Sequence, residues 1–271
     1  KIISELGKNR APVRIISMTE ERRARRYNFF SDAAADALVN LHGDAFIFVS
    51  RRGFATSVGC RDCGHVEICP ACAVPMVFYE KDKSLRCHYC QRVKKFTGTC
   101  PVCQSTLVEL RGAGVEFAEA EVRQLAASSR DTHDFIRIDS DMPTVPTLRH
   151  EHQIIIGTEK AFSFVRWDKL TLTIFADTDK LLAHPELRAA EDTWHRIHEV
   201  QFKRPNNSEL LIQTFDPNHI VFRGLTEPDR FYRLELHSRQ ALAYPPYTYL
   251  VRYCFGANDA ETSRIKAGEV F

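Results

Sequence analysis

The chain concentrates its metal-binding side chains in one region. Eight of its nine cysteines form four Cys-x-x-Cys pairs: Cys60/Cys63, Cys69/Cys72, Cys87/Cys90 and Cys100/Cys103. Each pair can bend into a knuckle whose two sulfurs face one ion, and two knuckles complete a tetrahedral zinc site. The spacing therefore predicts two zinc ions, each held by four thiolates.

The sequence between the second and third pairs favours one way of pairing the knuckles. Residues 74–86 have strand-like character, and 80–83 form a natural turn. A hairpin there would bring Cys69/Cys72 onto Cys87/Cys90 and leave the two outer pairs to share the other ion; sequential pairing is the alternative. Disulfides or an iron–sulfur cluster would also use cysteines, but disulfides across a Cys-x-x-Cys are usually single and redox-active. Zinc is the favoured interpretation.

Basic and aromatic side chains accompany the cysteines. The formal charge is +2, from 37 basic and 35 acidic residues, and two zinc sites of four thiolates, at −2 each, would change it to −2. The basic residues of this region either form a solvated surface or face phosphates, and Phe78 fits either a base-stacking surface or a hairpin core. Because eight sulfurs fill two tetrahedra, His65 and His88 are interpreted as bystanders. The candidate DNA contacts here are Lys81, Arg86, Lys94 and Lys95.

Alternating strand and helix patterns flank the cysteine region. Apolar runs predict strands at 14–18, 45–49, 135–138, 154–156, 170–176 and 210–214, and periodic apolar positions predict helices at 31–41, 115–127 and 189–200. Strands that alternate with helices imply an α/β fold with a parallel, doubly wound sheet. From about residue 229 we expect a helix to 243, a break at Pro245-Pro246 and a strand over 249–255, as the start of a second small domain.

Length and composition limit the classes of protein. The chain has 271 residues, of which 44% are hydrophobic and 27% charged, a balance that excludes a disordered or collagen-like chain. No apolar run approaches the roughly 18 residues that a membrane span needs. The chain begins with Lys1 rather than Met, and its final helical pattern stops abruptly at Phe271. We therefore expect a fragment of a longer protein.

Several elements, taken in order, resemble one family of replication proteins. The cysteine ladder follows Ser50-Arg51-Arg52-Gly53-Phe54-Ala55, and its spacings resemble those of the PriA (primosomal protein N′) family throughout. Further along, 112–116 resembles the family's Gly-x-Gly-Thr-Glu element, 154–158 its helicase motif V, 188–191 the lead-in to motif VI, and 244–247 the entry to its C-terminal domain. The resemblance covers nearly the whole chain.

The resemblance implies a fold, a ligand and partners. It implies the second RecA-like lobe of a superfamily 2 ATP-dependent 3′→5′ DNA helicase, and residues 1–55 and 109–226 would form this lobe. A zinc module over 56–108 would be inserted in it. Residues 227–271 would be the beginning of an α+β C-terminal domain. Forked and single-stranded DNA would be the ligands. The partners would be primosome proteins, the replicative helicase loader and single-strand-binding protein, in the cytoplasm and associated with the nucleoid.

Motor chemistry is not expected from this chain alone, and no catalytic residue is assigned. ATP hydrolysis needs a phosphate loop ending in Gly-Lys-Ser/Thr and a carboxylate pair for Mg2+, but Gly7-Lys8 is followed by asparagine. ATP and Mg2+ therefore belong only to a scheme that includes a first lobe. The family's motif VI, Gly-Arg-Ala-Gly-Arg, aligns with 202–206, where Lys203 and Asn206 replace arginines. Lysine keeps the charge but loses the planar fork. Motif V departs too, with Ser-Phe at 163–164 in place of Lys-Gly.

Further site residues follow from the resemblance. A degenerate nucleotide-binding surface would include Gly157, Asp177, Lys203 and Arg204, although Asp177 also fits a solvated turn. Thr158 would contact the DNA backbone. Arg51 and Arg52 fit either phosphate contacts or anchors for the zinc module.

Three functions compete at this point. The favoured one is a replication-restart protein that binds DNA and helps to assemble the primosome, with degenerate helicase motifs V and VI and no activity of this chain alone. The alternative is lobe 2 of an active 3′→5′ helicase. The third is a zinc-ribbon subunit of an RNA-handling complex, which predicts no preference for forked DNA.

Overall fold

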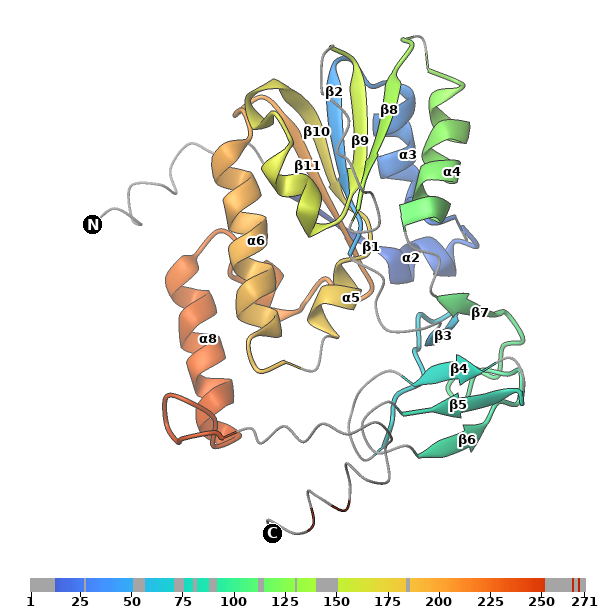
Figure 1. Cartoon of the computed structure of the whole chain (residues 1–271), viewed down its shortest axis with the longest axis vertical. Coiled ribbons are helices and arrows are strands. Elements are labelled where there is room, and N and C mark those ends of the chain that lie inside the picture. Colours follow the sequence, from blue (N-terminus) through green and yellow to red (C-terminus); the bar gives the residue numbers. More distant parts are fainter. Residues whose placement is uncertain are drawn as a thin grey trace.

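The computed structural model describes residues 13–26, 28–50, 57–70, 76–79, 82–87, 92–111, 115–129, 131–139, 151–183, 186–251, 265 and 268. Two sheets form within these ranges (Figure 1). The larger has six strands in the order β1-β11-β10-β2-β9-β8, and the smaller has five in the order β6-β5-β4-β3-β7. The cysteines that the structure describes belong to the smaller sheet and its loops; they are Cys60, Cys63, Cys69, Cys87, Cys100 and Cys103.

The larger sheet is parallel throughout. Its strands are β1 (Val13–Ser17), β2 (Asp44–Phe48), β8 (Asp134–Ile138), β9 (Gln153–Gly157), β10 (Leu170–Phe175) and β11 (Glu209–Thr214). All five neighbouring pairs run in the same direction. The predicted strands and the predicted parallel α/β sheet are therefore confirmed. The inner strands read as continuous apolar runs because helices cover both faces.

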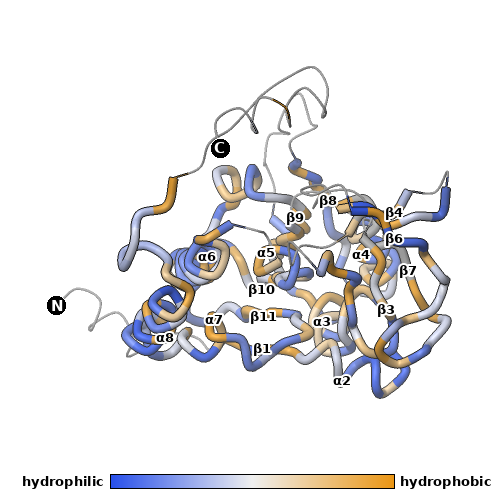
Figure 2. Tube along the Cα trace, turned by 90° about the horizontal axis from the view of Figure 1, so that it is seen from below, coloured by the Kyte–Doolittle hydropathy of each residue, from blue (hydrophilic) through white to orange (hydrophobic). Residues whose placement is uncertain are grey.

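Helices lie on both sides of this sheet. They are α2 (Met18–Arg23), α3 (Asp32–Val39), α4 (Val115–Ala126), α5 (Thr178–Leu182), α6 (Ala189–Lys203), α7 (Ile220–Arg223) and α8 (Pro228–Ala241), with 3-10 turns η1 (Glu159–Ser163) and η2 (Trp167–Lys169). Successive residues of β2 point to opposite faces: Phe46 packs in one core with α6, α7 and α8, and Ile47 packs in the other with α3 and α4. Hydrophobic segments gather between these layers, and α8 carries much hydrophilic colour (Figure 2).

The N-terminus of α3 agrees with the sequence signal, and one predicted strand is absent from the part of it that the structure describes. The Ser31 hydroxyl accepts a hydrogen bond from the backbone N–H of Ala34 at 3.2 Å, which caps α3 as the pattern predicts. The strand predicted over 249–255 is wrong for its described part, because 249–251 are not in a strand and Tyr249 is fully exposed. Among the described helices, none combines the length and apolar character of a membrane span.

The smaller sheet lies between β2 and α4 in the sequence, beyond the carboxyl ends of the larger sheet (Figure 1). Its strands are β3 (Ser57–Cys60), β4 (Val77–Tyr79), β5 (Ser84–Arg86), β6 (Val93–Lys95) and β7 (Val108–Arg111). The predicted hairpin is confirmed, since β4 and β5 pair antiparallel with Phe78 opposite Leu85. Phe78 packs against the module core, with its ring 5.3 Å from that of Phe96. Of the two roles considered for Phe78, the structure therefore supports the core.

Buried His133 and half-buried His219 predict how the lobe responds to acid. His219 caps α7 because its Nδ1 accepts a hydrogen bond from the backbone N–H of Val221 at 3.3 Å. Burial lowers the pKa of His219, although Asp216 and Glu235 partly oppose this effect, and burial also lowers the pKa of His133. The unfolded chain binds a proton at each of these histidines from about pH 6.5 downwards. The folded chain binds these protons only at lower pH, because both pKa values are lowered. The free energy of unfolding should therefore be greatest above pH 6.5 and fall as the pH falls further.

Urea unfolding at pH 7.5 and 5.5 checks this prediction. We expect a lower urea midpoint at pH 5.5, and a smaller difference in His219→Asn, whose amide oxygen keeps a neutral acceptor at the cap. An unchanged difference in that variant would exclude His219 as a source of the pH dependence.

Candidate metal centre and nucleic-acid interface

The two outer cysteine knuckles share one backbone conformation. The N–H of Cys60 donates to the carbonyl of His65 at 2.7 Å, and that of Gly64 donates to the carbonyl of Cys60 at 3.2 Å. The second knuckle repeats both bonds, from Cys100 to Ser105 at 2.8 Å and from Gln104 to Cys100 at 3.0 Å. The fifth residue of each knuckle has a positive φ, +75° at Gly64 and +59° at Gln104. These turns orient both sulfurs of each pair toward one point.

The structure brings together the four outer cysteines that the hairpin argument grouped in one site. The Sγ atoms of Cys60, Cys63, Cys100 and Cys103 all lie within 4.8 Å of one another. Cys60 and Cys103 are 3.5 Å apart, and Cys63 and Cys100 are 3.6 Å apart. A tetrahedral ion with Zn–S bonds of about 2.3 Å places sulfurs about 3.8 Å apart, whereas a disulfide needs about 2.05 Å. The donor set therefore fits zinc, and none of these four cysteines forms a disulfide in the structure.

Without a cation, the cluster favours a neutral thiol at Cys63. Burial, together with the neighbouring sulfurs, raises the pKa of Cys63 to about 12. Four thiolates so close together would repel one another without a positive charge between them. A divalent ion reverses this preference because it replaces the thiol protons when it binds.

The inner cysteines are described in part. Cys69 and Cys87 are completely buried and belong to one hydrophobic cluster with Met76 and Leu85. The β4–β5 hairpin connects them, as predicted. Cys72 and Cys90 lie outside the described residues, so the geometry of a second site stays a prediction.

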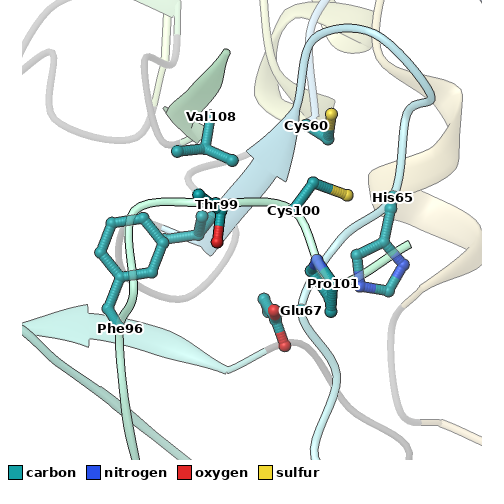
Figure 3. Close-up of a pocket in the computed structure, with 9 residues that line it drawn as sticks. Cys60, His65, Glu67, Phe96, Thr99, Cys100, Pro101 and Val108 are labelled. Carbon is teal, nitrogen blue, oxygen red and sulfur yellow. The ribbon is translucent and has the colours of Figure 1, made fainter. Parts of the chain in front are cut away.

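A buried acidic residue supports the outer site and was not predicted. Glu67 is only 7% exposed, and its Oε2 forms an ion pair with Nζ of Lys94 at 2.8 Å. It lines a small cavity of about 10 Å³ together with Cys60, Cys100 and His65 (Figure 3). Nothing in the sequence connects Glu67 with a lysine 27 residues away, because only the folded module places them together.

The candidate DNA-binding residues of the module divide between the two faces of the small sheet. In the β4–β5–β6 register, Tyr79 pairs with Ser84 and Ser84 with Lys95, while Arg86 pairs with Val93. Lys94 pairs with buried Leu85, so its side chain starts on the core face, where Glu67 holds it. Lys95 is exposed, and the Arg86 guanidinium lies over the Tyr79 ring at 4.7 Å beside Asp82. Arg51, Arg52 and Lys81 lie outside the described residues.

Thr158, the predicted contact to the DNA backbone, lies in a buried turn at the end of β9. It is 3% exposed and follows β9, where its N–H donates to the carbonyl of Ile138 at 3.1 Å. Its neighbour Gly157 is packed so closely that a Cβ would lie 2.5 Å from that carbonyl oxygen and 2.6 Å from Ala161. The turn is therefore buried within the lobe, and a contact of Thr158 with the DNA backbone stays a prediction.

The residues of the suggested nucleotide surface do not lie together. Gly157 and Asp177 follow strands at the carboxyl edge of the large sheet, whereas Lys203 and Arg204 lie at the other end of α6, whose 15 residues span about 22 Å. Asp177 accepts hydrogen bonds from the backbone and hydroxyl of Ser50 at 2.7 and 2.9 Å. Asp177 therefore joins the ends of β2 and β10.

The two basic residues of that surface also form contacts with other residues of the lobe. Lys203 pairs with Glu199 at 2.6 Å and lies over the Trp167 ring. Arg204 is 4% exposed and donates to the carbonyl and hydroxyl of Ser208. Both side chains are thus explained by contacts at the end of α6.

Comparison with known proteins identifies the family. A sequence profile for the PriA DNA helicase Cys-rich region (CRR) domain matches residues 69–95. Relatives named replication restart protein PriA are similar over most of the chain: one from Bacillus subtilis is 28% identical over 95% of this chain and 34% of its own length, and one from Treponema pallidum is 31% identical over 78% and 34%. The chain belongs to the PriA family. A Chlamydia muridarum relative with the same name is 32% identical over 79% of this chain and 30% of its own length.

Family membership gives both sheets an interpretation. The six-stranded parallel sheet is a RecA-like helicase lobe, and the small sheet is the family's zinc-binding cysteine module. The profile covers the inner cysteine pairs and the geometric cluster covers the outer ones, so the two observations bear on different sulfurs. The chain spans about a third of the length of the curated relatives it matches.

Proposed function

We propose that this chain is the lobe-2 and zinc-module part of a replication-restart protein, and that it contributes DNA contacts and primosome assembly rather than ATP chemistry of its own. The observation that carries the proposal is the four-cysteine cluster on a module that emerges from the carboxyl edge of a helicase lobe. Primosome proteins, the replicative helicase loader and single-strand-binding protein are its proposed partners, at the nucleoid in the cytoplasm.

The proposal includes two zinc ions per chain. Cys60, Cys63, Cys100 and Cys103 would hold the first, and the inner set of Cys69, Cys72, Cys87 and Cys90 would hold the second. Each ion would serve as a structural cross-link, since four sulfurs leave no open position for a substrate. The domain boundaries at 55/56 and 108/109 are part of the same proposal, whereas the expected boundary at 226/227 conflicts with α8, whose Phe231 packs in the lobe core.

The outward face of β4–β6 is the proposed DNA surface. It joins an exposed aromatic ring with cationic groups, which suits stacking on a base and pairing with phosphates. Asp82 holds the Arg86 guanidinium over Tyr79, so this pair is already oriented. We assign Tyr79, Arg86 and Lys95 to this surface, with Arg51, Arg52 and Lys81 as further proposed contacts.

Replacing Lys95 with alanine tests the DNA surface. If Lys95 neutralises one phosphate, forked-DNA affinity should fall and the slope of log K against log salt should decrease by about 0.9 for duplex or 0.7 for single strands. The control is Lys169→Ala, which removes another exposed lysine, just before the start of β10 in the large sheet. Fluorescence anisotropy over a salt series measures both. Equal slopes for the two variants would contradict the assignment.

Two further measurements separate the competing functions. Robust DNA-stimulated ATPase activity of the full-length protein would favour the active helicase. The hydrogen bonds of Asp177 with Ser50 and of Arg204 with Ser208 argue against a nucleotide role for those two side chains. Binding of structured RNA as tightly as forked DNA of equal length would favour the RNA-handling alternative. We expect a preference for the fork.

A further inference from the structure

The first zinc knuckle has a glycine that its own backbone does not require. Gly64 adopts a φ of +75°, and Gln104 adopts +59° at the matching position of the second knuckle, with the same hydrogen bonds around it. A residue with a side chain is therefore accommodated in this turn. Another contact must account for glycine at position 64.

That contact is an aromatic ring of the helicase lobe. A Cβ added to Gly64 would lie 2.4 Å from Cδ1 and 2.9 Å from Cε1 of Phe215. Real Cβ atoms do not approach other atoms this closely, and the atoms that would have to move belong to a rigid ring. The knuckle backbone therefore rests directly on Phe215, the first residue after β11.

The lobe holds Phe215 by both its backbone N–H and its backbone carbonyl. Its N–H donates to both carboxylate oxygens of Asp179 in α5 at 3.1 Å, and its carbonyl accepts from the hydroxyl of Thr19 in α2 at 2.9 Å. The Arg22 guanidinium lies 5.9 Å from its ring centroid. Helices α5 and α2 thus position one ring under the knuckle.

We propose that Phe215 is the docking residue that couples metal occupancy of the outer cysteine site to the carboxyl edge of the lobe. Zinc fixes the 60–65 turn, and the turn holds Gly64 against the ring of Phe215. The contact in turn keeps the Phe215 N–H bonded to Asp179 and the Phe215 carbonyl bonded to Thr19. Loss of the ion frees the turn and, through it, loosens this edge. The inference rests on the proposed zinc ligation by Cys60, Cys63, Cys100 and Cys103.

Hydrogen exchange at the Phe215 amide reads the coupling directly. In the zinc-loaded chain, chelation should raise its exchange rate about tenfold, within the range for coupled contacting residues. Gly64→Ala should raise the rate without a chelator. Gly98→Ala is the matched control, because Gly98 has a φ of +76° but no atom within 4 Å of its added Cβ. It carries the same backbone strain without the collision.

A double variant protects the test against simple misfolding. Gly64→Ala combined with Phe215→Ala removes the ring that the methyl group meets, so zinc retention in a chelator challenge should recover toward the wild-type value. Equal effects of Gly64→Ala and Gly98→Ala, or no recovery in the double variant, would overturn the coupling. Native mass spectrometry reports zinc separately: a chain that never binds zinc through the outer cysteines refutes the proposed site, whereas a zinc-loaded chain whose Phe215 amide ignores chelation refutes only the coupling.

Discussion

Replacing Cys103 with serine will remove one zinc ion per chain and unfold the cysteine module locally, while the helicase lobe stays folded. Cys103 is exposed, so the substitution removes a ligand without opening a cavity. The remaining three sulfurs cannot complete the tetrahedron, and structural zinc contributes on the order of 10–16 kcal/mol to folding in small zinc domains. Native mass spectrometry should count two ions in the wild type and one in the variant.

The lobe supplies an independent signal for this experiment. The chain has two tryptophans, Trp167 and Trp194, and both lie in the lobe. Their fluorescence should change little when the site is lost, whereas exchange of the β3 and β7 amides should become fast. Cys254→Ser, which changes the one cysteine outside the cluster, should keep both ions. Two ions in Cys103→Ser would mean that the outer cysteines do not share one site.

Much of the lobe could be predicted because its signals are local. An apolar run such as 154–156 has no polar alternation, which marks a strand covered on both faces, and Ser31 is a cap that the next three residues reveal. The cysteine spacing was equally informative, since the hairpin over 77–86 needs only neighbouring residues to form. Each of these predictions depends on contacts within a short segment.

The rest depends on contacts that sequence distance conceals. Thr158 resembles a backbone-contacting residue by position, but the packing of Gly157 against Ile138 buries it. Lys203 and Arg204 are assigned to the nucleotide surface because they align with motif VI. In the fold, α6 places them at the edge of the large sheet opposite Asp177. The contact between Gly64 and Phe215 joins residues that follow strands of different sheets. A single sequence does not reveal such pairs, because no local pattern requires them.

Truncating Phe231 to alanine should destabilise the lobe by about 3–5 kcal/mol. Phe231 lies in α8, which the sequence assigns to the beginning of another domain, yet its side chain is completely buried in the lobe core. Its ring stacks on Trp194 with centroids 4.8 Å apart and planes 6° apart. Gly224 permits this approach, because a Cβ there would lie 2.4 Å from that of Phe231. The indole N–H of Trp194 also donates to the Gly224 carbonyl at 3.2 Å.

Urea unfolding followed by tryptophan fluorescence measures this effect where it arises, since Trp194 is the residue that loses its stacking partner. Leu236→Ala is the control on the same helix, because Leu236 is 39% exposed and a surface truncation changes stability by only about 0.5 kcal/mol. A similar midpoint for the two variants would show that α8 contributes little to the lobe and would favour a domain boundary near residue 227. A large difference makes α8 the last helix of the lobe, so that any following domain must begin beyond Ala241.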